Sequence, residues 1–586
     1  MSGIPEIIGI VVGVAPVIFK ATVETWKAVD DAIDFDDDAE DLIIRLERTK
    51  AHLGIWAAKA GLTAGELVDS LHPFDELIVR ILERIRDLFA EVEQQGQKYG
   101  LVPKDSKDSK TITATVIQMR KSLHSIMSNS STKSSIVRLV EKRAAVQTAS
   151  VRVDVAVRKR ASWAVRDKKR FAHFIEMLEQ HVHGLRKFTI EKSQKQIQQD
   201  EARLAMDIIR GLTDPAALLQ LQRASGLDSA SSQIGLHVLA KWKAITVQRA
   251  VSANTDPDTR DWSLARSTME DRARIRFLKE SSTDPDVAYL FEKKEYDLNI
   301  EDDSKDHLRE RIYQLLSLLG GNGGRSHLHT LKTVGYLDDP DYHCWWIVFR
   351  FPLSPIDHLE PHSNEPMSLR ALYVSPFKPP LEERYRLAKR LVDTFAKLYG
   401  SSWMHKGINS KNIIFPQLYS ASVSKSFTSI QTALIQGFNY SRQLSQAQTI
   451  DRGKVLHDLE SAIYRHPNYQ GEAATGYQIH YDIYSLGLVL LEIALWGPIM
   501  DLLAAKIRPG TDSVVTLAPT MSHFHEAEAL ELKRRVMIRI NGDVAYRVGT
   551  RYKEMVRWCL TLDGPVTAIE FYNTVAIPLD ELCGQY

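Results

Sequence analysis

The stretch that decides the fold of the C-terminal half is WMHKGINSKNIIF, residues 403–415. It follows residues 381–400, where apolar residues recur at the spacing of a helix with one buried face. It ends in the apolar run 413–415, which predicts a short buried strand. The sequence therefore predicts a polar loop held between a long helix and a strand.

Strands precede this segment and helices follow it. Residues 287–294 and 345–352 have the composition of strands, and residues 308–319 have the pattern of a helix. After the loop, residues 482–492 form an apolar run with an acid at each end. A few strands followed by a helix-rich half are typical of a two-lobed α+β domain, which we expect over residues 276–586.

The loop resembles the catalytic loop of protein kinases, His-Arg-Asp-Leu-x-x-x-Asn followed by a strand. His405, Lys406, Ile408 and Asn412 match that motif by identity or type, whereas Gly407 stands at the catalytic Asp. Further kinase markers follow in order: IQGFNY (435–440) near Asp-Phe-Gly, YRHP (464–467) near Ala-Pro-Glu, and DIYSLGLVLLE (482–492) as the hydrophobic F helix with its buried Asp482. The resemblance implies a kinase-like fold.

The carboxylates of phosphoryl transfer are missing from these positions. Transfer needs one carboxylate to orient the substrate hydroxyl and another to hold Mg²⁺. Gly407 replaces the first; Gly437 replaces the second if Phe438 takes the Phe of the motif, and Gln436 does so in a shifted register. No glycine lies between Gly235 and Gly320, so the predicted strand region lacks a glycine-containing loop that could cover phosphates. We expect a pseudokinase with no catalytic residue, metal or cofactor, and weak ATP binding is the alternative.

Two registers are open for the lysine that meets the phosphates in kinases. Lys293 or Lys294 can pair with Glu310 as the strand lysine and helix glutamate do in that family, or Glu292 can stand at the lysine position. Lys294 and Glu310 are therefore the candidate nucleotide-binding residues. We expect His405 to be structural and Asn412 to be a loop residue with satisfied polar groups.

The N-terminal part has a helical pattern. Residues 39–61 and 73–95 place apolar residues at i, i+3, i+4 and i+7, and further helices are expected over about 136–160 and 163–199. Polar stretches at 104–110 and 128–135 are typical of exposed loops. The pattern predicts an all-α helical bundle over residues 1–225, followed by a helical brace or linker over 226–275.

An apolar run without a charge extends from Ile7 to Phe19, 13 residues. A membrane-spanning helix needs about 20 residues, and Glu6 stands where a secretory signal has its basic start. We expect neither a constitutive span nor secretion, and the alternatives are a buried core helix and a helix that enters lipid on exposure. The candidate membrane-active residues are Ile7, Ile8, Ile10, Val11, Val12, Val14, Val17, Ile18 and Phe19.

Charge is balanced overall but not locally. The chain has 75 basic and 74 acidic residues, so nothing global points to nucleic acid. Residues 133–170 are strongly basic, and this surface is either a solvated helix face or a docking face for anionic lipid. Its candidate members are Arg158, Lys159, Arg160, Lys168, Lys169 and Arg170. Three scattered cysteines indicate reduced thiols rather than a disulfide framework or a zinc site.

Three stretches resemble the HeLo (prion-inhibition and propagation) domain of fungal incompatibility and cell-death proteins. They are IIGIVVGVA (7–15), LERTKAHLGIW (46–56) and RASWAVRDKKRF (160–171), similar in order and spacing over about residues 1–220. The resemblance implies a cytosolic helical bundle whose N-terminal hydrophobic helix is exposed on activation and permeabilises a membrane. A C-terminal prion-forming segment commonly supplies the trigger in that family, so a kinase-like region implies a different trigger here.

Together the resemblances imply a regulated cell-death or incompatibility effector with a pseudokinase as its sensor. The implied partners are anionic membrane lipid, an upstream protein activator and further copies of the chain on activation, without nucleic acid. The implied location is the cytoplasm, with movement to the plasma membrane on activation. Two alternatives are an atypical active protein kinase, performing ATP-dependent Ser/Thr phosphotransfer and carrying a helical targeting domain, and a non-lytic signalling scaffold.

Overall fold

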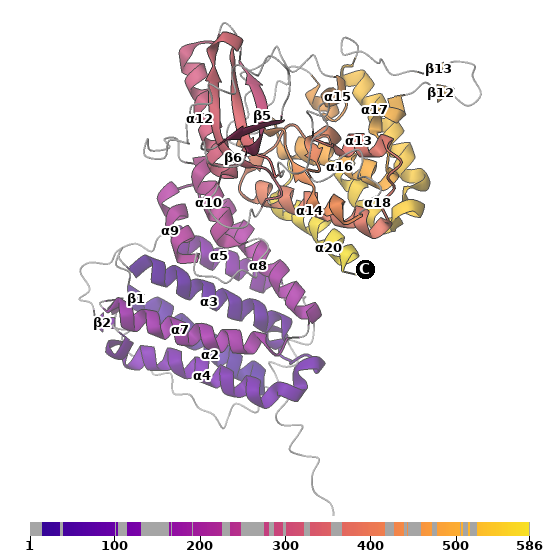
Figure 1. The fold of residues 1–586 in the computed structure, drawn as a ribbon. Coiled ribbons are helices and arrows are strands. Elements are labelled where there is room, and N and C mark those ends of the chain that lie inside the picture. The colour runs from indigo at the N-terminus through magenta and orange to yellow at the C-terminus, as the bar shows by residue number, and fades with distance from the viewer. Residues whose placement is uncertain are drawn as a thin grey trace, which may run out of the picture. The chain divides into compact units, whose positions relative to one another are not determined.

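The protein divides into two compact units, Met1–Ala244 and Ile245–Tyr586, each with its own core (Figure 1). The computed structural model describes residues 14–34, 39–99, 101–103, 114–129, 163–165, 167–189, 191–225, 235–247, 275–279, 286–296, 300–320, 328–352, 366–416, 427–438, 442–443, 459–470, 477–503, 506–507, 514–515 and 524–584.

The first unit is a bundle of helices. They are α2 (Val14–Ala32), α3 (Glu40–Lys59), α4 (Asp75–Gln94), α5 (Ala114–Asn129), α7 (Lys168–Arg186), α8 (Glu191–Gly211), α9 (Pro215–Ser225) and α10 (Leu236–Val247). Helices α3 and α4 confirm the helices predicted over 39–61 and 73–95, because their apolar stripes are continuous enough to be recognised without the structure.

Helices α2, α4 and α7 share an aromatic core. The rings of Trp26 and Phe89 lie 6.5 Å apart, and those of Phe89 and Phe174 lie 5.9 Å apart. Thr22 on α2 donates to the Leu82 carbonyl on α4 at 3.5 Å, and Trp26 lies by Phe89 further along both helices, so α2 and α4 run in the same direction. Helix α7 runs the opposite way, because Phe188, just after it, lies by Phe74 at the start of α4. Burial of each such ring stabilises the bundle by about 1.5–3 kcal/mol.

The prediction of one helix over 163–199 is wrong. Residues Trp163–Val165 form strand β3, which pairs in parallel with β1 (Ile33–Asp34) and antiparallel with β2 (Leu101–Pro103). Helix α7 then begins at Asp167, whose carboxylate accepts from the amides of the second and third residues that follow, and this cap fixes the start of the helix. After Arg186 the chain turns before α8 begins.

Helix α5 lies between the stretches 104–110 and 128–135, which were predicted as exposed loops, and it includes residues 128 and 129 of the second stretch. Two of its fully buried positions are Thr115 and Ser122, beside the apolar Val116 and Met119, so the helical stripe is weak in an apolar count. The expected helix over 136–160 and the expected loop over 104–110 lie outside the described residues.

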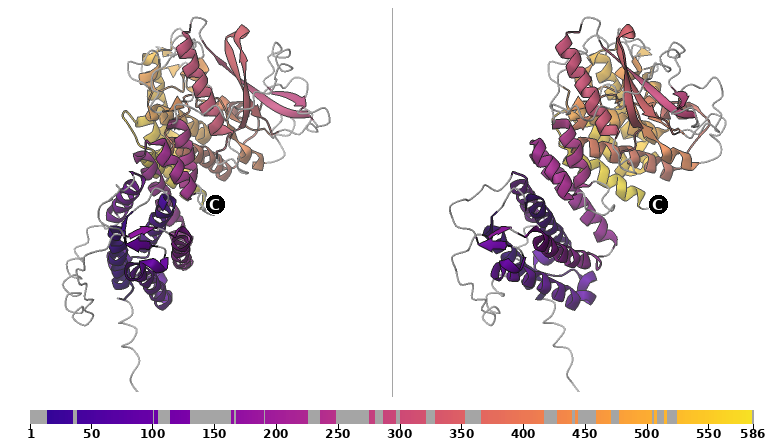
Figure 2. Two further views of the ribbon diagram at one scale, coloured as in Figure 1. Left: turned by 90° about the vertical axis from the view of Figure 1, so that its left-hand side faces the viewer. Right: turned by 60° about the vertical axis from the view of Figure 1, so that its left-hand side comes forward.

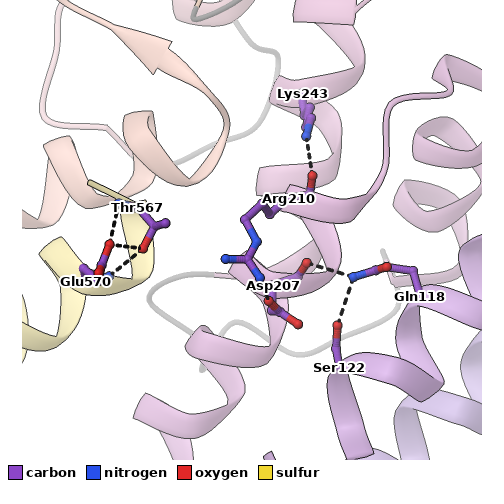
Figure 3. Close-up of polar contacts among 7 residues, drawn as sticks. All are labelled: Gln118, Ser122, Asp207, Arg210, Lys243, Thr567 and Glu570. Carbon is purple, nitrogen blue, oxygen red and sulfur yellow. Dashed lines mark hydrogen bonds and ion pairs between the residues drawn. The ribbon is translucent and has the colours of Figure 1, made fainter. Parts of the chain in front are cut away.

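The compact first unit extends beyond residue 225 because α10 is attached to α8. Lys243 on α10 donates to the carbonyls of Ile209 (2.6 Å) and Arg210 (3.4 Å) at the C-terminus of α8 (Figure 3). On the other side of α8, Gln118 of α5 donates to the Asp207 carbonyl at 3.3 Å. A fragment that ends at 225 therefore leaves the C-terminal carbonyls of α8 without this lysine.

The second unit begins with a four-stranded antiparallel sheet of order β4-β5-β7-β6. Its strands are β4 (Ile275–Lys279), β5 (Asp286–Glu295), β6 (Lys332–Asp339) and β7 (Cys344–Arg350). Helix α12 (Asp302–Leu319) lies along the sheet (Figure 2), and Thr333 of β6 donates to its Leu316 carbonyl at 2.9 Å. The strands predicted at 287–294 and 345–352 and the helix at 308–319 are confirmed.

Helices make up most of the rest of this unit. They are α13 (Leu369–Val374), α14 (Leu381–Gly400), α15 (Leu459–Ala462), α16 (Ile479–Leu495), α17 (Glu526–Arg539), α18 (Ala545–Thr561), α19 (Ala568–Phe571) and α20 (Ile577–Cys583). Short strands pair as β8 (Trp403–Met404) with β11 (Arg442–Gln443), β9 (Ile413–Ile414) with β10 (Leu434–Ile435), and β12 (Lys506–Ile507) with β13 (Val514–Val515). Helix α14 has the bounds that the sequence predicted.

Helix α16 is the centre of the second unit. Every residue from Ile479 to Ala494 is buried, as expected for a helix that is apolar on all sides. A Cβ at Gly487 would lie 2.7 Å from the Cys559 side chain of α18, so the glycine permits close approach of the two helices. Tyr552 of α18 donates to the Leu490 carbonyl at 3.0 Å. The helix predicted over 482–492 is confirmed.

Candidate functional site

The start of α2 carries the described part of the apolar run. Ile7, Ile8, Ile10, Val11 and Val12 lie outside the described residues. Val14, Val17, Ile18 and Phe19 form the first turns of α2, where Ile18 and Phe19 are buried in the bundle and Val17 is 57% exposed. The first turns therefore have one face in the core and an apolar residue on the surface.

Other exposed apolar side chains belong to the same end of the bundle. Phe74 immediately precedes α4 and Leu77 lies in its first turn, and they are 38% and 48% exposed. Because α2 and α4 run in the same direction, Val17, Phe74 and Leu77 all lie where these helices begin. The ring of Phe74 also contacts Phe188, just after α7, with centroids 5.2 Å apart.

A cluster of exposed basic residues begins α7. Arg158, Lys159 and Arg160 lie outside the described residues, whereas Lys168, Lys169 and Arg170 form the first turn of α7 and are all exposed. Cations at a helix N-terminus are disfavoured by the helix dipole, by about 0.3–1 kcal/mol each. Asp167 offsets part of this cost, with its Oδ2 3.2 Å from the Nε of Arg170. An anionic partner would offset more.

The basic turn and the described part of the apolar run, residues 14–19, lie at opposite ends of α2. Strand β1 follows α2 and pairs with β3, with Ile33 beside Trp163, and β3 leads into α7. The basic turn is therefore near the C-terminal end of α2, while Val14 begins that helix. A helix of 19 residues is about 28 Å long, which sets the separation of the two features.

In the second unit, Asp482 holds the loop that follows β8. Its buried carboxylate accepts from the backbone amides of His405 (2.6 Å) and Lys406 (2.8 Å) and from the hydroxyl of Tyr477 (2.6 Å). Burial raises the pKa of Asp482, and the three hydrogen bonds oppose that rise because they stabilise the carboxylate. The start of α16 thus fixes the backbone of the loop.

His405 connects this loop to residues 436–438. Its Nε2 donates to the Gln436 carbonyl at 3.1 Å, and its Nδ1 accepts from the Gly407 amide at 3.2 Å, which together define one neutral tautomer. Complete burial lowers the pKa of His405 to about 4, so the ring is neutral at pH 7. The ring of Phe438 packs against it, with centroids 4.4 Å apart.

Gly407, Asn412 and Gly437 meet at very short range. The Asn412 side chain donates to the Gly407 carbonyl at 2.6 Å. Gly437 has φ +84°, a left-handed conformation that favours glycine, and a Cβ there would lie 2.2 Å from the Asn412 amide. A Cβ at Gly407 would lie 3.0 Å from the Gly437 carbonyl. The two backbone segments approach this closely because both positions lack a side chain.

The side chain that reaches this cluster from the sheet is Glu292. The Gly437 amide donates to its Oε1 at 2.9 Å, and Glu292 is only 4% exposed. On the same strand, Lys293 pairs with Glu295 at 2.8 Å, and Lys294 is half-buried beside Trp345 in the register. The structure brings Glu292 to Gly437.

Glu310, the other candidate nucleotide-binding residue, lies on α12. Its Oε2 is 3.9 Å from Nδ1 of His307, one turn earlier on the helix. The sequence pattern allows Glu292 only as an alternative to Lys294 at the lysine position. The sequence feature that points to Glu292 as a buried residue is its position directly after the apolar residues Tyr289, Leu290 and Phe291. All three are buried, as is Glu292.

The donor set of the cluster limits its chemistry. Gly407 and Gly437 provide no side chain, Asn412 and Gln436 provide amides, and Glu292 provides a carboxylate to the 436–438 segment. Across the described ranges, no group of three or more His, Cys, Asp or Glu residues is arranged to hold a metal ion. Within those same ranges, no helix has the length and apolar character required to cross a bilayer.

Comparison with known proteins identifies the first unit. Residues 7–221 match the family model described as HeLo, prion-inhibition and propagation. The N-terminal region is therefore HeLo-type, and its helices fit such a bundle. A search of curated proteins found no match to the chain.

Proposed function

We propose that the protein is a regulated effector of cell death or incompatibility, in which a HeLo-type bundle acts on a membrane under the control of a kinase-like unit without catalytic activity. The observation that carries the proposal is the HeLo match over residues 7–221, which suggests a function related to cell death or incompatibility. The membrane step, the control by the second unit and the resting location in the cytoplasm are parts of the proposal.

The kinase-like assignment of the second unit is supported by how its sequence markers meet. His405 and Asn412 belong to the loop, and Phe438 and Asp482, from two other markers, both contact His405. Because Phe438 packs on the His405 ring, we assign Phe438 to the Phe of the kinase motif, which puts Gly437 at the position of the metal-binding Asp. This favours the register in which Gly437, and not Gln436, replaces that Asp.

The same geometry argues against phosphoryl transfer. Neither Gly407 nor Gly437 offers a carboxylate to a substrate hydroxyl or to Mg²⁺. Glu292 reaches the Gly437 amide from the strand on which kinases carry the lysine that meets the phosphates. A carboxylate at this position does not supply the positive charge that the kinase lysine offers to the phosphates. We therefore propose a pseudokinase without bound nucleotide or metal.

The membrane step rests on two features of the first unit. The apolar run that leads into α2 is shorter than a constitutive span, and the basic turn of α7 is exposed to an anionic surface. We propose anionic lipid as the partner on activation, an upstream protein as activator of the second unit, and self-association of the released bundle.

Leakage of anionic liposomes tests the membrane step. A fragment of residues 1–247, which keeps α10, is expected to release dye, and Val11→Asp should abolish release because a charge in mid-helix costs about 3 kcal/mol on insertion. Ile117→Asp is the matched control, since Ile117 is 42% exposed on α5, outside the run. Undiminished leakage by a folded Val11→Asp fragment would refute insertion by this segment, and a folded but inactive parent fragment would favour the scaffold.

A kinase assay on the full chain tests the second unit. We expect no Mg²⁺-dependent phosphorylation, and Gly407→Asp should remain inactive because an oriented acceptor is useless without bound metal and nucleotide. Phosphotransfer by the wild-type chain that disappears in Asn412→Ala would establish an atypical active kinase instead.

A further inference from the structure

Three consecutive amides of residues 435–437 donate to three different parts of the second unit. The Ile435 amide donates to the His329 carbonyl (2.8 Å), that of Gln436 to the Asn412 carbonyl (2.8 Å) and that of Gly437 to the Glu292 side chain (2.9 Å). The first and last of these acceptors precede α14, and the middle one follows it. The segment 435–437 therefore joins the sheet side of the unit to its helical side.

The bond to Glu292 differs from the other two. Its acceptor is a side chain, while the Ile435 and Gln436 amides donate to backbone carbonyls. A rotamer change of Glu292 is sufficient to break it, whereas loss of the other two requires movement of the backbone. Because Gly437 is buried, its amide would then lack a partner until the segment rearranges.

We infer that Glu292 is a latch, a positioning residue whose carboxylate couples the sheet of the second unit to the segment 435–438. Strand β5 lies between β4 and β7, and Glu292 faces Ile347 in the β7 register, so the acceptor is mounted on an interior strand with neighbours on both sides. At the other end, the buried Gly437 amide donates to the carboxylate at 2.9 Å, and the next residue, Phe438, packs on the ring of His405.

The latch is closed when the Gly437 amide donates to Glu292, and β5 is then connected through residue 437 to the contact of Phe438 with His405. The latch is open when this hydrogen bond is broken, and the contact of Phe438 with His405 then has no connection to β5 through this bond. A partner that offers Glu292 a cationic side chain would compete with the Gly437 amide and favour the open state in proportion to its preference for that state. The regulatory meaning of the latch rests on the proposed function, whereas its existence does not.

Hydrogen exchange of the full chain, measured without lipid or nucleotide, tests the latch. In Glu292→Ala and in the longer, apolar Glu292→Met we expect amides of residues 435–438 to exchange about tenfold faster, while amides of β5 and β7 keep their protection. Glu292→Gln should keep the wild-type rate, because its amide oxygen can accept the same bond. Glu295→Ala removes a carboxylate from the exposed face of the same strand and is the control.

Unchanged exchange in Glu292→Met would overturn the inference. A Glu292→Gln protein as unprotected as Glu292→Met would also overturn it, because the accepting oxygen would then not be what matters. If Glu292→Ala does not fold, the Met and Gln variants still decide. Since the measurement involves no membrane, failure of the latch leaves the proposed membrane function standing, and failure of liposome leakage leaves the latch standing.

Discussion

Asp482 accepts the backbone amide of His405 at 2.6 Å although the two residues are 77 positions apart in the chain. The same carboxylate accepts from the Lys406 amide at 2.8 Å, and Lys406 has a left-handed backbone, with φ 64°. A non-glycine residue in that conformation needs compensation from its surroundings. The first turn of α16 supplies it, and the loop is held in one conformation by a helix far along the sequence.

Replacement of Asp482 by Asn should destabilise the second unit by about 1–3 kcal/mol. Three donors point at the two carboxylate oxygens of Asp482, and an Asn side chain offers them only one oxygen. Its NH₂ group would face a buried donor, which would be left without an acceptor. Chemical denaturation of the full chain measures the loss, and hydrogen exchange locates it in residues 403–412. Asp501→Asn, at an exposed position, should be neutral. Equal stability of the two variants would show that the carboxylate does not hold the loop.

Gly437→Ala should cost more than 2 kcal/mol, because it combines an unfavourable φ with a Cβ 2.2 Å from the Asn412 amide. Shortening Asn412 to Ala in the same protein should recover part of that loss by removing the clash while the backbone strain remains. A double-mutant cycle measures the coupling. Strictly additive effects would mean that the two residues do not meet as described.

Neutralising the basic turn of α7 should weaken binding to anionic vesicles. Lys168→Gln, Lys169→Gln and Arg170→Gln remove three charges, each contributing about 1 kcal/mol near such a surface, and the remaining binding should depend less on salt. The matched control removes three exposed charges elsewhere in the unit, with Lys187→Gln, Lys195→Gln and Arg223→Gln. Co-sedimentation across a salt series makes the comparison. If both triple variants bind equally, the turn is only a solvated face.

Glu492 should give the second unit a pH-dependent stability. Burial raises its pKa to about 7, although it accepts from the Tyr464 hydroxyl (2.6 Å) and the Ile499 amide (2.7 Å). The folded state holds the proton that the unfolded chain releases near pH 4.5, so this contribution is complete below pH 4.5 and is lost as pH rises through 7.

Comparison with Glu492→Gln isolates this effect. The free energy of unfolding of the wild type relative to the variant should fall by about 3 kcal/mol between pH 4.5 and pH 8. Protonation of His405, whose low pKa acts in the opposite direction, is common to both proteins and cancels in the difference. Hydrogen exchange of α16 over that pH range measures the stability locally. A difference that does not change with pH would indicate that Glu492 titrates normally.

Strong amphipathic patterns were sufficient to predict some elements. Helix α14 has the predicted bounds, since its apolar stripe is continuous from Leu381 to Gly400. The break between α7 and α8 was missed because both helices have continuous helical patterns, and the turn after Arg186 is made by local hydrogen bonds such as that from Thr189 to the Arg186 carbonyl at 2.8 Å. Helix α5 was missed because hydroxyl residues fill part of its buried face.

The site was predictable to the extent that its motifs are contiguous in sequence. His405 and Asn412 could be assigned to one loop from their spacing alone. The run Glu292-Lys293-Lys294-Glu295 could not be oriented, because a strand alternates its faces and the sequence allows either register. In the folded sheet, where β5 pairs with β7, Glu292 is on the buried face of β5 and Lys293 is exposed.

The length of α2 limits how the bundle can rest on a bilayer in the proposed membrane step. A bundle that stood on the end carrying Val17 would hold its basic turn about 28 Å from the lipid, beyond the Debye length of about 8 Å in physiological salt. One flat bilayer contacts both Val17 and the basic turn when the common axis of α2, α4 and α7 lies along its surface. Infrared dichroism of oriented films would then find these helices in the membrane plane, and neighbouring copies would meet side to side.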